Sequence, residues 1–136
     1  MSKQKNYDLQ ILGVYRPPGE NVGPAVEILA NILEESQAHN KKTVLIGDIN
    51  IDRLKQDTKN EALNQELNTY NIKRLPLPAT RTTAESATSI DCICTNFPES
   101  DINFMVIKTG LSDHTAQLCK LNTYPITGSV QLTIKR

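Results

Sequence analysis

The chain has 136 residues, of which 38% are hydrophobic and 4% aromatic, and its 15 basic residues balance its 15 acidic ones. This length and composition suit one globular domain and exclude a disordered chain. The zero net charge gives no sign of the basic surface that marks many nucleic-acid-binding proteins. No apolar run approaches the roughly 20 residues that cross a bilayer, so no membrane partner is expected.

The first half of the chain alternates strand and helix patterns. Residues 7–15 alternate apolar and polar positions before two prolines, and residues 43–46 form a short apolar run, so each predicts a strand. A helix is predicted between them, from Pro24 to about Ala38, because apolar residues recur there with helical spacing at Val22, Val26, Leu29 and Leu33. A strand, a helix and a strand in this order predict a βαβ-like layer.

The second half is richer in strands. A shorter helix is expected over residues 60–69, then a short edge strand within 73–77 and a polar, threonine-rich connection over 80–89. Strands follow over residues 89–95, 102–107 and 116–121. The tail, residues 129–135, also alternates in strand fashion.

Three cysteines, an odd number in a chain without a signal peptide, indicate a reduced, intracellular setting. Cys92 and Cys94 have the residue type of zinc ligands, but no second Cys or His pair has matching spacing. They are therefore expected to be small apolar residues on one face of a strand.

The segment Gly47-Asp48-Ile49-Asn50 directly follows an apolar strand. In extended backbone, residues two apart point the same way, so Asp48 and Asn50 present a carboxylate and an amide to one spot. A carboxylate can accept a proton from water, and an amide can bind a phosphate oxygen or orient that water. Taken alone, the segment is more typical of a turn than of a catalytic site.

Three further segments carry polar groups at predicted strand ends. Asp91 lies inside an apolar run, where a carboxylate needs a charged partner. Asp113 and His114 follow Ser112, a triplet that is also common in loops and at helix N-caps. Tyr15 ends the first strand before Arg16 and two prolines.

The order of these motifs, Tyr-Arg-Pro-Pro, Gly-Asp-Ile-Asn, Thr-Arg, Ile-Asp and Ser-Asp-His, resembles the C-terminal half of the exonuclease–endonuclease–phosphatase superfamily. This superfamily includes deoxyribonuclease I and apurinic/apyrimidinic endonucleases. The motifs are most similar to endonuclease domains of jockey-type non-LTR retrotransposons, and the resemblance runs from Leu9 to Leu121. It implies an α/β fold that is part of an αββα sandwich, with about one sheet layer and two main helices. Residues 1–122 would form a truncated domain, and residues 123–136 a C-terminal extension with a further strand.

The resemblance also implies roles for the motif residues. Asp48 would activate water, Asn50 would hold the phosphate or that water, and His114 would contact a non-bridging phosphate oxygen. Asp91 would pair with His114 and fix its ring, while Tyr15 would donate its phenolic hydrogen to the phosphate.

Metal and DNA contacts are implied in the same way. Asp113 would take part in binding Mg²⁺. Thr80 and Arg81 would contact DNA, and Arg16 is interpreted either as a phosphate contact or as a surface cation. Arg53, Lys55, Lys73 and Arg74 are expected on solvated faces.

The chain departs from the superfamily pattern in one respect. An asparagine and the glutamate that is the principal Mg²⁺ ligand normally precede the strand that carries Tyr15, and no glutamate lies before it here. Three interpretations follow: a fragment of a DNA endonuclease that is inactive or impaired alone, a non-catalytic interaction module derived from that fold, or a phosphatase acting on a phosphorylated lipid or sugar. The expected partners are DNA and a complementary N-terminal half, or a second copy bound through an exposed sheet face. The resemblance implies a nuclear location.

Overall fold

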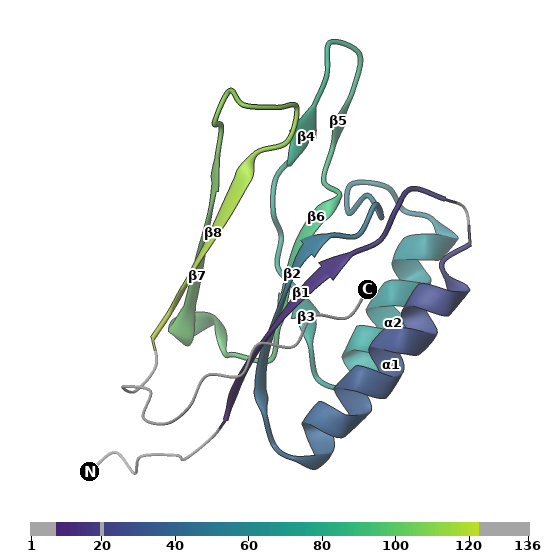
Figure 1. Cartoon of the computed structure of the whole chain (residues 1–136), viewed down its shortest axis with the longest axis vertical. Helices are drawn as coiled ribbons and strands as arrows, with labels where there is room; N and C mark the ends of the chain where they lie inside the picture. Colours follow the sequence, from purple (N-terminus) through teal and green to yellow (C-terminus); the bar gives the residue numbers. More distant parts are fainter. Residues whose placement is uncertain (1–7, 20, 123–136) are drawn as a thin grey trace.

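A computed structural model describes residues 8–19 and 21–122. It shows an α/β fold built on a four-stranded sheet with the strand order β1-β2-β6-β3 (Figure 1). These strands are β1 (Leu9–Tyr15), β2 (Lys42–Asp48), β6 (Asp91–Thr95) and β3 (Lys73–Arg74). Strands β1 and β2 are parallel, whereas β6 is antiparallel to both of its neighbours. The predicted fold class and the predicted βαβ-like layer are therefore confirmed.

Two helices, α1 (Gly23–Ala38) and α2 (Thr58–Thr69), lie side by side on one face of this sheet (Figure 1). Pro24 occupies the first turn of α1, where its missing N–H costs no hydrogen bond. Asp57 caps α2 by accepting a hydrogen bond from the backbone N–H of Asn60 at 2.9 Å. Each helix is followed by an asparagine with positive φ, Asn40 and Asn71, which turns the chain back into the next strand.

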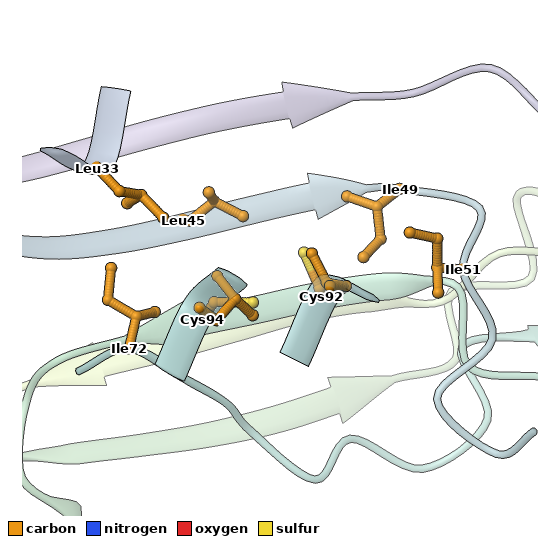
Figure 2. Packing of buried hydrophobic residues seen from close by; sticks show 9 residues of the cluster. Leu33, Leu45, Ile49, Ile51, Ile72, Cys92 and Cys94 are labelled. Atoms are coloured by element: carbon orange, nitrogen blue, oxygen red, sulfur yellow. The ribbon is translucent and has the colours of Figure 1, made fainter. Parts of the chain in front are cut away.

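The first core cluster lies between the helices and the sheet. Leu33 of α1 packs toward Leu45 of β2, with Cys92 and Cys94 from β6 in the same layer (Figure 2). Both cysteines are buried and lie on one face of their strand, as expected from residues two apart. Their predicted place as small apolar core residues is confirmed.

The opposite face of the sheet carries a second layer, which is a hairpin of β7 (Ile102–Ile107) and β8 (Ala116–Leu121) preceded by a 3₁₀ turn, Glu99–Asp101 (Figure 1). Val44 and Ile93 are 3% and 0% exposed in the cluster between these layers. The expectation that this face is open to water is therefore wrong for the middle of the sheet. It holds for the edge strand β1, where Ile11 is 63% exposed.

A second hairpin, β4 (Arg81–Thr82) and β5 (Ala87–Thr88), projects beyond the sheet (Figure 1). Its turn is closed by a hydrogen bond from Thr83 N to Ser86 O at 2.8 Å. The sequence predicted only a polar connection here. Two-residue strands with exposed side chains carry no alternating apolar signal, so the pattern could not reveal this hairpin.

The predicted C-terminal extension, residues 123–136 with its further strand, lies outside the described residues. Within residues 8–19 and 21–122 there is no helix that is both long enough and apolar enough to span a membrane.

Candidate active site

Three polar side chains form a row across the strand ends. Tyr15 is the register partner of Asp48 in the parallel pair, and Asp48 is the register partner of Asp91 in the antiparallel pair. Side chains alternate between faces along a strand, so Asp48 lies on the same face as Val44 and Ile46, and Asp91 on the same face as Ile93. The two carboxylates therefore face the layer that contains β7 and β8.

This arrangement costs stability. Like charges placed directly opposite each other on neighbouring strands repel, and Asp91 is only 6% exposed. The burial of Asp48 raises its pKa above the ordinary value, and the charge of Asp91 raises it further. Its hydrogen bond from Asn50 N and the charges of His114 and Arg81 act against this rise.

His114 comes from the other layer, two residues before the start of β8, and completes the cluster. Its Nδ1 lies 3.1 Å from Oδ2 of Asp91, and the ligand atoms of Asp48, Asp91 and His114 all lie within 4.8 Å of one another. The structure thus places Asp91 beside the imidazole, as expected, and brings Asp48 close to both groups. Because Nδ1 faces Asp91, Nε2 is the ring nitrogen left to meet a substrate.

Gly47 allows the first two strands to approach each other beside the site. Its φ is +150°, and a Cβ at this position would lie 1.9 Å from the backbone oxygen of Val14. No side chain fits there, so the glycine of the Gly-Asp-Ile-Asn motif keeps β1 against β2. It thereby keeps Tyr15 beside Asp48.

Asn50 follows in a left-handed conformation with φ of 51°, which asparagine tolerates well. Its backbone N–H donates to Oδ1 of Asp48 at 3.1 Å, and its side-chain Nδ2 donates to the carbonyl of Arg16 at 2.7 Å. The Asn50 amide therefore ties the loop after β2 to the end of β1, and its Oδ1 accepts no hydrogen bond from the residues that the structure describes.

The side chain of Arg16 is bound to backbone carbonyl groups of two loops. Its guanidinium donates to the carbonyl oxygens of Gly19 at 2.8 Å and of Ile49 at 3.3 Å. These bonds direct the guanidinium toward neighbouring loops, so the structure favours a clamp between two loops over the phosphate contact that the sequence left open.

Thr80 is fully buried at 0% exposure, which conflicts with the predicted direct contact to DNA. Its hydroxyl accepts hydrogen bonds from the backbone N–H groups of Ile90 at 3.2 Å and Asp91 at 3.1 Å. Its carbonyl accepts from Thr115 N at 2.7 Å. Thr80 thus joins the start of β6 to the segment carrying His114, and it positions the Asp91–His114 pair.

Asp113 lies at the rim, outside the cluster of three. Its Oδ2 is 2.8 Å from Nε of Arg81, and this hydrogen bond from Arg81 lowers the pKa of Asp113. Arg81 also forms a backbone bridge with His114, so the exposed β4 strand borders the site. The predicted metal role of Asp113 and DNA contact of Arg81 stay predictions.

The sequence did not predict the positions of Arg53 and Arg74, whose side chains bind backbone carbonyl groups. Arg74 donates from Nη2 to the carbonyls of Ile51 and Ser89, and Arg53 binds the carbonyl of Leu77 through Nε and Nη2. Both are partly buried, so the expectation of solvated faces is wrong for them.

The carboxylates of Asp48 and Asp91 are of the ligand type that Mg²⁺ requires. This ion binds oxygen ligands and commonly takes one or two carboxylates together with phosphate and water. Among the described residues, one carboxylate oxygen of Asp48 and one of Asp91 accept no hydrogen bond, and the mutual repulsion of the two groups would be relieved by a cation. The two carboxylates therefore fit such an ion, although they supply only part of its six ligands.

Comparisons with known proteins support the fold. No family model matches the chain, and no curated protein matches it. Among solved structures, the chain is similar to the endonuclease domain of TRAS1, a telomere-specific non-LTR retrotransposon, with a TM-score of 0.65 and 15% sequence identity. The match covers 82% of this chain and 56% of that domain, so the chain spans little more than half the length of its neighbour. The chain thus has a partial deoxyribonuclease I-like fold, and the predicted likeness to retrotransposon endonuclease domains is confirmed at the level of fold.

Proposed function

We propose that the chain provides the hydrolytic part of a metal-dependent DNA endonuclease that cleaves a phosphodiester bond. The observation that carries this proposal is the meeting of Asp48, Asp91 and His114, from two strands of one layer and a loop of the other, within 4.8 Å. Two carboxylates rarely lie opposite each other on neighbouring strands for structural reasons alone, because their repulsion has no benefit for folding.

In this proposal Asp48 accepts a proton from the attacking water. A raised pKa suits this role, because a general base acts best when its pKa approaches the working pH. His114 donates from Nε2 to a non-bridging phosphate oxygen, and Asp91 holds the ring in that orientation through Nδ1. The Oδ1 of Asn50 orients the water, and the exposed phenol of Tyr15 contacts the phosphate from the rim.

Mg²⁺ would be held by Asp48 and Asp91, and when bound it supplies positive charge that stabilises the phosphate and the leaving oxygen. Asp113 joins it only by giving up its bond to Arg81. Because Mg²⁺ needs about six oxygens, a further carboxylate from outside the described residues completes the site. For this reason we expect no nicking by the isolated chain.

The outer face of the β7–β8 hairpin is the proposed contact for the missing part. Met105, Ile107 and Leu118 are 56%, 41% and 44% exposed there. Within the described part of the chain, each of the two strands pairs only with the other. Large apolar side chains on the outer face as well as the inner face are typical of an inner layer, so we propose that a complementary half of the domain covers this strand pair.

Complementation tests this function. The chain is mixed with the N-terminal half of a retrotransposon endonuclease domain, and Mg²⁺-dependent nicking of supercoiled plasmid is measured. We expect nicking only in the mixture, and a loss of about 100-fold or more with Asp48→Ala but not with the exposed control Glu27→Gln. Self-association of the chain in place of a mixed complex, or nicking that survives Asp48→Ala, contradicts the proposal.

A further inference from the structure

A second polar cavity lies beside the first turn of α2, separate from the Asp48 cluster. Its volume is about 490 Å³, and its lining includes three cations, Arg53, Lys55 and Arg74, and two carboxylates, Asp57 and Glu61. The segment that supplies two of these cations directly follows the Gly-Asp-Ile-Asn motif. Two of the cavity's cations therefore lie on the loop that follows the proposed general base, Asp48.

The two arginines are held in place without a counter-ion. Backbone carbonyl oxygens at 2.7 to 2.9 Å fix both guanidinium groups. Among the described residues, neither Arg53 nor Arg74 has a carboxylate within 4.0 Å. Nη1 of Arg53 and Nε of Arg74 make no hydrogen bond within this part of the chain. These N–H groups are donors on guanidinium groups that are fixed in position and form no ion pair within the described residues.

Two nearby carboxylates, those of Asp52 and Asp57, accept backbone hydrogen bonds. Oδ1 of Asp57 accepts the capping hydrogen bond of α2, and Oδ1 of Asp52 accepts backbone N–H bonds from Leu54 at 3.0 Å and Ser89 at 2.9 Å. Burial lowers the pKa of Arg74, and the charge of Arg53 adds to the lowering, whereas the charge of Asp52 acts against it. Two neighbouring guanidinium groups that keep N–H donors available in a partly enclosed space favour an anionic ligand.

We propose that this cavity binds a phosphate group through Arg53, Arg74 and Lys55. Guanidinium groups suit this ligand, because their planar N–H groups match phosphate oxygens in pairs. The source of the phosphate that fits the proposed endonuclease function is the backbone of a DNA strand leaving the Asp48 cluster, and this part of the inference rests on that function. Free phosphate offers the same chemistry.

Titrations of the ¹⁵N-labelled chain, followed by NMR, test the inference without any nuclease activity. Inorganic phosphate is the first probe and a short DNA duplex the second. Lys55→Gln removes a cation whose ammonium makes no contact in the described chain, and Lys120→Gln is the matched control on the exposed side of β8. Glu61→Gln removes a carboxylate from the cavity wall.

We expect phosphate to shift the signals of Arg53, Lys55 and Arg74. Affinity should fall about threefold or more with Lys55→Gln, rise about twofold with Glu61→Gln, and stay unchanged with Lys120→Gln. Duplex DNA that shifts the same signals identifies the backbone as the source, whereas a response to inorganic phosphate alone identifies a small-anion site. The inference is overturned if neither probe shifts these signals, or if Glu61→Gln weakens binding. If the complementation assay shows nicking but neither probe shifts the signals of the cavity residues, the phosphate site is rejected and the proposed endonuclease function is retained.

Discussion

The two ends of the β2–β6 pair differ in how their polar groups are satisfied. At one end, Asn96 accepts a hydrogen bond from Thr43 N at 2.8 Å and donates to Lys41 O at 3.1 Å, while the hydroxyl of Thr95 donates to Thr43 O at 2.8 Å. At the other end, Asp48 and Asp91 oppose each other and rely on His114 from another layer. Neutral groups that satisfy the backbone stabilise the fold, whereas opposed charges are retained at the expense of stability, which is typical of functional sites.

The largest expected effect comes from Gly47→Ala, which forces apart the strands that hold the charged end. The new Cβ would meet the Val14 carbonyl at 1.9 Å, so we expect a loss of about 2–4 kcal/mol in the free energy of unfolding, measured by urea denaturation. Gly13→Ala on the neighbouring strand is the control, because no atom lies within 4 Å of its added Cβ. Equal unfolding midpoints for the two variants would show that this close approach is absent.

Asn96→Ala disrupts the end of the β2–β6 pair at which neutral side chains satisfy the backbone polar groups. It removes two hydrogen bonds to backbone groups, so the free energy of unfolding should fall by about 1–3 kcal/mol. Asn103→Ala on the exposed face of β7 should change it by less than about 0.5 kcal/mol. If Asn96→Ala proved neutral, the contrast between the two ends would have no energetic basis.

Asp48→Asn tests the contrast between the neutral and the charged end from the other side, because this substitution at the charged end should increase stability. The folded state raises the pKa of this carboxyl above its ordinary 3.8, so folding favours the protonated form. Below the unfolded-state pKa the Asp48 carboxyl is neutral in both states. As pH rises through the folded-state pKa, its ionisation lowers stability.

Asparagine stays neutral at every pH. We therefore expect Asp48→Asn to be more stable near pH 7 by less than about 1 kcal/mol, since solvent screens the group, and equal to wild type near pH 3. Urea denaturation at both pH values measures this difference, with the exposed Asp8→Asn as control. A variant less stable than wild type near pH 7 would contradict the raised pKa.

The smallest effect is expected at the rim. Arg81→Gln removes the hydrogen bond that lowers the pKa of Asp113, so this pKa should rise toward its ordinary value. Both side chains are largely exposed, and the unfolding temperature should not change measurably. A carboxyl pH titration by NMR reads out Asp113 directly, and an unaltered titration would show that the pair does not form in solution.

Much of the framework could be predicted because its signals are local. The strands over 102–107 and 116–121 match the structure residue for residue, since alternation and turn signals bound them. The helix predicted from residue 60 begins at Thr58, because Asp57 provides the N-cap that the apolar spacing does not register.

The candidate site could be predicted only in part. Asp48, Asp91 and His114 could be named because the motif order resembles a known superfamily, and the structure brings them together. The places of Thr80 and Arg74 could not be foreseen. Their partners are backbone N–H and C=O groups of distant segments, and only tertiary packing brings these within reach.

We propose above all that the charged end of the β2–β6 pair binds a divalent metal ion and a phosphodiester group. Paramagnetic broadening by Mn²⁺, a stand-in for Mg²⁺, tests it most directly on the ¹⁵N-labelled chain. The amide signals of Asp48, Asn50 and Asp91 should broaden first, those of Thr43 and Thr95 should stay sharp, and Asp48→Asn should abolish the effect. Broadening centred on Asp57 and Glu61, or none at millimolar Mn²⁺, would contradict the account.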